Sequence, residues 1–296
     1  MSLDIGQALR EGASRTVEKN GLTLAAVFAG IALLTTVLFQ TLTVGIAEAM
    51  LDFVQELSAE EMQEAGMSEA EFEEMTAELE AAAEEFRDTA PLALGLPVGA
   101  AAGGLLVLAL VHEAARLIAV RVFATDSSDE VTSDLVTDNI LLATLNGFIG
   151  GIVVWGLIIV GLVFIIIPGI ILAVLFYFLR QEIALNDKNF VQAMADSWRI
   201  TKGHRIEVFL IGFIVVLVSR LEEISSTAVG VVSTPAGAVA AAIVGGLLAA
   251  FGTAVVTRAY VQINDDDASD ADVDETTDDI EDDPYDAALG PDDLSR

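Results

Sequence analysis

One stretch of the sequence begins like a catalytic motif, His112-Glu113-Ala114-Ala115-Arg116. A zinc-protease helix carries two histidines four residues apart, with a glutamate general base between them. Here the second histidine position holds Arg116, and the chain has two histidines and no cysteine. A zinc site of this type cannot be completed, and thiolate sites, disulfides and a cysteine nucleophile are excluded as well. We predict that His112 and Glu113 mark the water boundary of a membrane span, with Glu113 pairing to Arg116.

The remaining polar candidates are Gln40 and Asn146, which lie within long apolar runs. We interpret both as interhelical hydrogen-bonding residues, and the alternative is a ligand site. The sequence has no glycine-rich phosphate loop, no G-x-S-x-G elbow and no span with paired carboxylates. Ionisable residues are almost absent from the apolar runs, which counts against a proton- or sodium-coupled transporter. We therefore predict no catalytic residue, no metal and no cofactor.

The elements that must position these residues are membrane helices. Hydrophobic residues make up 54% of the 296 residues and the mean hydropathy is +0.61, yet the formal net charge is −31. Of the 45 acidic residues, 15 lie between Glu48 and Asp88 and 15 between Asp265 and Asp293, so charge and apolar sequence are segregated. So acidic a chain cannot neutralise nucleic acid phosphates. The imbalance is typical of a salt-adapted cell, where charge repulsion is screened, and the alternative is an acidic interaction tail.

The apolar runs predict an all-α bundle of six transmembrane helices over residues 21–263. The third and fourth spans share the forty apolar residues Ile140–Leu179, about 60 Å as one helix, so the chain must turn back between Gly161 and Gly169. The other spans are Leu22–Ala47, Pro91–Val111, Ile206–Leu221 and Pro235–Val261. Small residues at four-residue spacing predict close helix packing. These residues are Gly95, Gly99, Gly103, Gly147, Gly151, Gly237 and Gly245.

An acidic helical loop, residues 48–90, follows the first span. Ser58-x-x-Glu61 and Ser68-x-x-Glu71 both fit the capping box that begins a helix. After the second box an apolar stripe runs along a glutamate-covered helix, at Phe72, Met75, Leu79, Ala82 and Phe86. The loop is interpreted as a helical hairpin that covers its own bundle. The alternative is a coiled-coil contact with a second copy or with another membrane protein.

Surface-lying helices complete the prediction. Residues 1–20 form an amphipathic helix on the cytoplasmic leaflet. If a unit of surface helix plus membrane hairpin occurs three times in the chain, Glu130–Asn139 is the candidate surface helix of the middle unit. The segment Asn189–Lys202 is predicted to lie in the cytoplasmic interface and to end at Gly203. Its interfacial residues are Phe190, Met194, Trp198, Arg199 and Lys202.

The basic residues set the orientation. With six spans and a cytoplasmic N-terminus, twelve of the fourteen lysines and arginines are cytoplasmic, and Arg87 and Arg220 are outside. The chain is thus predicted to be a multi-pass cell-membrane protein with both termini cytoplasmic, and residues 264–296 to be a disordered acidic tail.

Two segments carry a family resemblance: Ile167-Pro168-Gly169-Ile170, and the run from Gln192 to Gly203, QAMADSWRITKG. Together they resemble the YciC-like membrane proteins and the membrane domain attached to some glycerophosphodiester phosphodiesterases. The resemblance implies a polytopic architecture, and the chain has no room for the soluble phosphodiesterase domain. We expect a non-enzymatic membrane protein of a salt-adapted cell that organises the envelope or bilayer, with membrane lipids as partners. The alternative is a transporter or channel component for a small or lipid-like solute.

Overall fold

The computed structural model describes residues 3–57, 66, 68–125, 133–164, 166–229 and 234–278. Within these residues the chain is all-helical and has no strand. Four segments are long and apolar enough to cross a membrane: Lys19–Glu56, Ile140–Phe164, Ile166–Asn186 and Pro235–Asp265. The predicted capping box at Ser58 and Glu61 lies outside the described residues.

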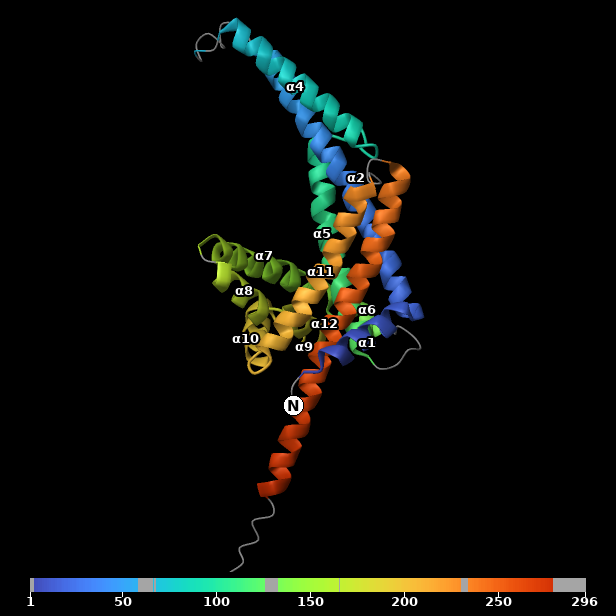
Figure 1. Cartoon of the computed structure of the whole chain (residues 1–296), viewed down its shortest axis with the longest axis vertical. Helices are drawn as coiled ribbons and strands as arrows, with labels where there is room; N and C mark the ends of the chain where they lie inside the picture. Colours follow the sequence, from blue (N-terminus) through green and yellow to red (C-terminus); the bar gives the residue numbers. More distant parts are fainter. Residues whose placement is uncertain are drawn as a thin grey trace, which may run out of the picture.

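Four long helices run side by side along the length of the molecule (Figure 1). They are α2 (Lys19–Glu56), α5 (Val98–Ala124), α11 (Arg205–Val229) and α12 (Pro235–Asp278). The shorter helices α1 (Ile5–Val17), α6 (Ser133–Thr137), α9 (Leu179–Asn186) and α10 (Phe190–Ile200) gather at one end, and α4 (Glu69–Thr89) lies at the other. The bundle therefore has two chemically different ends.

The first long helix continues past the predicted end of span one at Ala47 and reaches Glu56. Residues 48–56 retain apolar side chains at helical spacing, and Val54 is buried, so nothing in this stretch stops the helix. Helix α4 packs back against this extension, so a hairpin is present, but its other arm is α2 itself and the pair projects beyond the bundle rather than covering it (Figure 1). The predicted capping box begins α4: the Ser68 hydroxyl accepts from the Glu71 N–H at 3.3 Å, and the Ser68 N–H donates to Glu71 Oε2 at 2.8 Å.

Helix α12 crosses α2 at close range. A Cβ added at Gly246 would lie 2.4 Å from the Ala25 carbonyl oxygen and 2.6 Å from the Ala29 nitrogen. The buried small residues of this face recur every four positions, at Ala238, Ala242, Gly246, Ala250 and Ala254. We predicted the neighbouring series that contains Gly237 and Gly245. The packed face is therefore displaced by one residue, although Gly237 itself is also buried.

The glycine series of α5 does not pack as predicted among the described residues. A Cβ added at Gly95, Gly99 or Gly103 would meet no atom within 4 Å. The contact with α2 is instead made by the adjacent Gly104, whose added Cβ would lie 3.1 Å from Leu38 Cδ1.

The amphipathic helix predicted in residues 1–20 is α1, and Asp4 caps it by accepting from the Gln7 N–H at 2.9 Å. Its small face crosses α12 so closely that a Cβ added at Gly12 would lie 2.4 Å from Val255 Cγ2. Arg258 Nε of α12 donates to Glu11 Oε2 at 2.6 Å. This helix is thus an integral part of the bundle end rather than a separate anchor.

The predicted fold-back within Ile140–Leu179 is present, because α7 (Ile140–Phe164) is followed by α8 (Ile166–Leu175) packed against it. The two arms are unequal: α7 has 25 residues and α8 has 10. The pair leans away from the four long helices at a steep angle (Figure 1).

The C-terminal helix runs to Asp278. The prediction of disorder from residue 264 is therefore wrong for residues 264–278, and residues 279–296 lie outside the described residues. The candidate middle surface helix is represented by the five residues of α6.

Candidate functional site

Helix α10 is the predicted interfacial helix, and its boundaries follow from its sequence. Asn189 caps it, with its Oδ1 accepting from the Gln192 N–H at 3.0 Å while Gln192 Oε1 accepts from the Asn189 N–H at 3.4 Å. The chain leaves the helix through Gly203, whose φ of +103° lies in the left-handed region that glycine tolerates. The predicted end is confirmed.

The buried face of α10 is rotated from the predicted stripe. Ala193, Ser197 and Thr201 have no exposed surface, whereas Phe190 and Met194 are half-buried against α7 and α9. Ser197 Oγ donates to the Leu175 carbonyl at 2.8 Å and accepts from the Phe178 N–H at 3.1 Å. These groups lie where α8 ends and α9 begins, so Ser197 supplies hydrogen bonds that a broken helix would otherwise lack.

The predicted interfacial side chains Trp198, Arg199 and Lys202 lie on the outer side of α10. Trp198 is 48% exposed, with its ring centroid 6.2 Å from that of Phe176. Arg199 pairs with Asp196 at 2.8 Å, and Lys202 is exposed. An indole beside exposed cations is the arrangement expected at the headgroup level of a membrane.

The fluorescence of Trp198 tests this placement. In a Trp155→Phe background reconstituted into vesicles, we expect blue-shifted emission that is quenched by lipids brominated high on the acyl chain. The indole ring would then lie among the first carbons of the chains while its N–H stays hydrated. Efficient quenching by aqueous iodide, with no response to brominated lipid, would place α10 in water.

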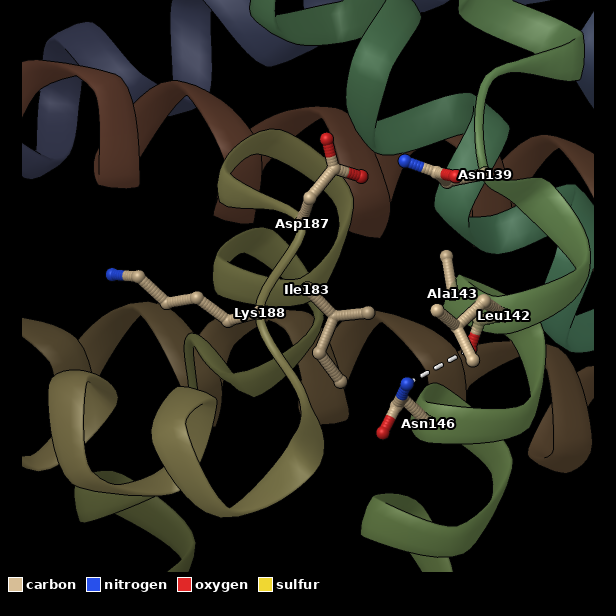
Figure 2. A pocket seen from close by; sticks show the side chains of 7 residues that line it. All are labelled: Asn139, Leu142, Ala143, Asn146, Ile183, Asp187 and Lys188. Atoms are coloured by element: carbon tan, nitrogen blue, oxygen red, sulfur yellow. Dashed lines mark hydrogen bonds between the residues drawn. The ribbon is translucent and has the colours of Figure 1, made fainter.

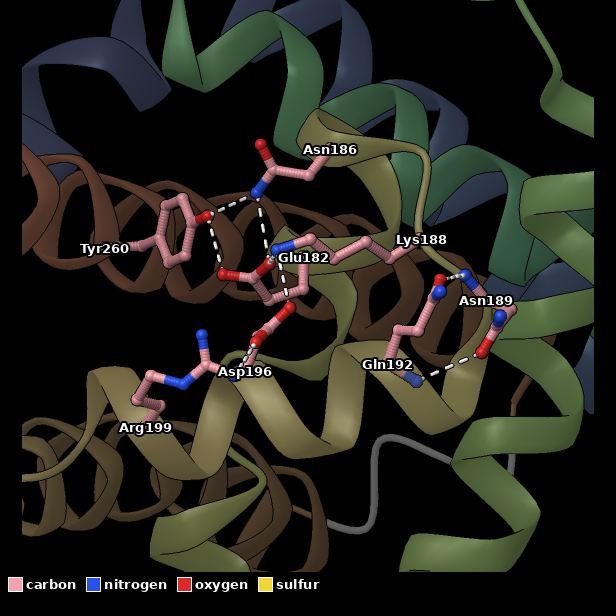
Figure 3. A network of polar contacts seen from close by, with 8 residues as sticks. All are labelled: Glu182, Asn186, Lys188, Asn189, Gln192, Asp196, Arg199 and Tyr260. Carbon is pink, nitrogen blue, oxygen red and sulfur yellow. Dashed lines mark hydrogen bonds and ion pairs between the residues drawn. The ribbon is translucent and has the colours of Figure 1, made fainter.

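A buried polar cluster ties α9, α10 and α12 together (Figure 3). Glu182 of α9 has no exposed surface, and its Oε1 accepts from the Tyr260 hydroxyl at 2.8 Å. Its Oε2 accepts from Lys188 Nζ at 2.6 Å and from Asn186 Nδ2 at 3.1 Å. Lys188 Nζ also pairs with Asp196 Oδ2 of α10 at 2.7 Å. Because both carboxylate oxygens of Glu182 have donors, the burial of its charge is compensated.

The charges of this cluster are mutually stabilised. Burial alone would lower the pKa of Lys188, but the hydrogen bonds and charges of Asp196 and Glu182 raise it above its usual value. The hydrogen bond and charge of Lys188 lower the pKa of Asp196. The stabilisation from Asp196 is therefore present above the ordinary aspartate pKa and is lost as the pH falls through the lowered value.

A second ion pair joins α5 to α9 beneath the α7–α8 hairpin. Arg180 Nε and Nη2 donate to the two oxygens of Glu113 at 2.8 and 3.1 Å. The predicted pairing of Glu113 with Arg116 is therefore wrong; its partner lies 67 positions away. The glycines of α7 make room for the pair, because a Cβ added at Gly147 would lie 2.6 Å from Glu113 Oε1 and one at Gly151 would lie 3.3 Å from Arg180 Nη2.

Gln40 and Asn146 both bond to backbone groups of other segments. Gln40 Oε1 accepts from the Leu92 N–H at 2.9 Å. Asn146 Oδ1 accepts from the Phe190 N–H at 3.2 Å, so α7 helps to hold the start of α10. Asn146 therefore bonds between two helices, as interpreted, whereas Gln40 of α2 bonds to the connection between α4 and α5 rather than to another helix.

A small pocket of about 30 Å³ lies between the start of α7 and the end of α9 (Figure 2). Asn139 and Asp187, both at left-handed φ values of 47° and 50°, lie at its rim, while Lys188 extends away from it. The other lining residues are Leu142, Ala143, Asn146 and Ile183. Among the described residues, no group of three histidine, aspartate or glutamate side chains could hold a metal ion.

Three contributors to these clusters were not recognised from the sequence. Glu182, Asn186 and Tyr260 lie at the ends of apolar segments, where polar residues are usually hydrated. The available signal was local: Glu182 and Asn186 are four residues apart on one helix face, six and two positions before Lys188.

A protein-family model matches residues 3–263 of the chain, and its description is a domain of unknown function, DUF7847. The chain belongs to the DUF7847 family. The DUF7847 match begins just before α1 and ends at Ile263, the last residue before the predicted acidic tail. It therefore includes both polar clusters, the acidic hairpin and all six predicted spans. No curated protein matches the chain, and no solved structure matches it.

Proposed function

We propose that this DUF7847 protein is a non-enzymatic integral membrane protein that organises the bilayer of a salt-adapted cell. The observation that carries the proposal is the lipid-like exterior of its long helices. Large apolar side chains are exposed on all the long helices, including Leu34, Phe39, Leu106, Ile152, Phe213 and Ile243. So extensive an apolar surface must be shielded from water, and the acyl chains of lipids shield it in a membrane.

The arrangement of the two ends supports a multi-pass threading with both termini cytoplasmic. Helices α1, α6, α9 and α10 lie at one end of the bundle (Figure 1), and α1, α9 and α10 carry four of the twelve basic residues assigned to the cytoplasm, Arg10, Arg15, Arg180 and Arg199. Acidic α4 lies at the opposite end. The six predicted apolar segments correspond to α2, α5, α7, α8, α11 and α12, and we propose that all six enter the bilayer of the cell membrane. The proposal includes the resemblance to YciC-like membrane proteins, which implies the same polytopic architecture.

The chemistry of the polar clusters supports a structural role. The Glu182 carboxylate accepts three hydrogen bonds, and the Glu113 carboxylate is held in a bidentate pair by Arg180. Neither carboxylate lines the described pocket. These groups fix helices against one another, which is what a scaffold requires.

The alternative, a component that moves a small or lipid-like solute, is favoured by one observation. The pocket in Figure 2 lies beside Asn146, one of the two polar residues within the apolar runs. Both functional groups of that amide are engaged, because its Nδ2 donates to the Leu142 carbonyl at 3.0 Å and its Oδ1 accepts from Phe190.

Reconstitution separates the two functions. In vesicles at molar salt, we expect the protein to increase acyl-chain order in proportion to its density, as measured by diphenylhexatriene anisotropy. Permeability to ions, glycerol and fluorescent lipid analogues should stay at the level of protein-free vesicles. Saturable protein-dependent flux that is lost on replacing Asn146 by leucine would contradict the scaffold and support the transporter.

A further inference from the structure

One arm of the α7–α8 hairpin is too short to cross a bilayer by itself. The segment Ile166–Asn186 reaches membrane-spanning length only when α9 is added, and α9 begins with Leu179 followed by the polar residues Arg180, Gln181 and Glu182. The ten residues of α8 span about 15 Å, half of a hydrocarbon core of about 30 Å. After Leu175 the chain turns and begins α9 at Leu179, and the next residue, Arg180, is already paired with Glu113. Helix α8, measured from the surface of the hydrocarbon core, therefore reaches only the middle of the membrane.

The longer arm, α7, is long enough to cross a bilayer but is not oriented across it. Helix α7 would span about 37 Å if it stood upright. In the structure it leans steeply away from the four long helices (Figure 1). Its base is fixed in this direction, because Gly147 and Gly151 lie directly against the Glu113–Arg180 pair.

The side chains at the tip of the hairpin are apolar and suit a hydrocarbon environment rather than water. These apolar side chains are strongly exposed: Val163, Phe164, Ile166 and Ile167 are 76%, 80%, 65% and 66% exposed. Apart from the Trp155 indole, no polar or charged side chain occurs between Ile152 and Phe176. A turn that emerged into water outside the cell would expose all of this apolar surface and would lack the polar residues that turns normally carry.

The backbone close to the tip is helical in both arms of the hairpin. Helix α7 continues to Phe164 and α8 begins at Ile166, and a Cβ added at Gly161 would lie 2.8 Å from the Gly169 Cα. Pro168 occupies the first turn of α8, where a missing N–H removes no intrahelical hydrogen bond. Helical backbone on both sides of the turn limits the groups without intrahelical partners to the helix ends, and Pro168 removes one of those N–H groups.

We propose that α7 and α8 form a re-entrant hairpin that enters the cytoplasmic leaflet and returns to the cytoplasm. Its partner is the acyl chains of that leaflet. This inference rests on the proposed function and replaces two of the predicted spans. It leaves every other segment on the same side of the membrane, because a hairpin and a pair of spans return the chain to the same side. Apolar volume added to one leaflet is a direct means of organising a bilayer.

The depth of the tip tests the hairpin. In a Trp155→Phe, Trp198→Phe background, Phe164→Trp should be quenched most strongly by lipids brominated deep in the acyl chain. The matched variant Leu141→Trp, at the base of the same helix, should respond most to shallow bromines. Equal shallow quenching of both positions would place the tip at the outer interface and overturn the proposal.

Accessibility gives the second readout and separates this proposal from the proposed function. The chain has no native cysteine, so Phe164→Cys can be probed alone with an impermeant maleimide. We expect no labelling from either side of the membrane. Labelling from outside would overturn the hairpin while leaving the membrane scaffold intact. Labelling of Ala195→Cys on α10 from outside would instead overturn the threading in the proposed function.

Discussion

Replacing Glu182 by alanine is expected to lower the free energy of unfolding by about 3 kcal/mol, the largest loss from any single polar side chain in the described chain. The carboxylate has no exposed surface and accepts from three donors, Asn186 on α9, Tyr260 on α12 and Lys188 between α9 and α10. Its removal leaves the Tyr260 hydroxyl and the Asn186 amide without the acceptor that they share. It also removes the hydrogen bond between Glu182 of α9 and Tyr260 of α12.

Thermal unfolding in detergent at molar salt measures this effect. At about 2 to 4 °C per kcal/mol, the midpoint of Glu182→Ala should fall by roughly 6 to 12 °C. The matched control is Asp196→Ala, which removes the other partner of Lys188 but from a less buried site. It should cost less than about 1 kcal/mol, because Lys188 keeps Glu182. Equal midpoints for the two variants would show that the buried cluster does not hold the helices together.

Replacing Gly246 by alanine should cost about 2 kcal/mol although it adds one methyl group. The new Cβ would lie 2.4 Å from the Ala25 carbonyl oxygen and 2.6 Å from the Ala29 nitrogen. Both are backbone atoms, so the clash can be relieved only by moving α12 away from α2. The loss should appear as a lower unfolding midpoint and as faster cleavage by added protease.

Gly103→Ala is the matched control for this substitution. It adds the same methyl group to a glycine of another long helix, where no atom lies within 4 Å of the new Cβ. We expect no loss of stability, and a small gain from the better helix propensity of alanine. A loss equal to that of Gly246→Ala would mean that the packing in Figure 1 does not determine which glycines matter.

The sequence predicted most of the helices because apolar runs and capping signals are local. The fold-back between Gly161 and Gly169, the Ser68 capping box and the end of α10 at Gly203 all depend on residues within a few positions of one another. Each was therefore visible without knowledge of the tertiary structure.

The packing partners could not be predicted in the same way. The alanine-rich start of α12 contains two parallel series of small residues, one with Gly245 and one with Gly246, and the sequence alone does not select between them. Glu113 had a plausible local partner in Arg116, but the pairing observed is with Arg180, which the fold brings from another helix. The end of α8 at Leu175 likewise depends on Ser197, twenty-two positions later.

The central claim is that a membrane separates acidic α4 from α1 and α10. Single cysteines at exposed alanine and serine positions test it most directly: Ala77→Cys on α4, Ser14→Cys on α1 and Ala195→Cys on α10. In intact cells at molar salt, an impermeant maleimide should label Ala77→Cys alone, and permeabilisation should expose the other two. Labelling of all three sites in intact cells, or protection of Ala77→Cys, would contradict the account.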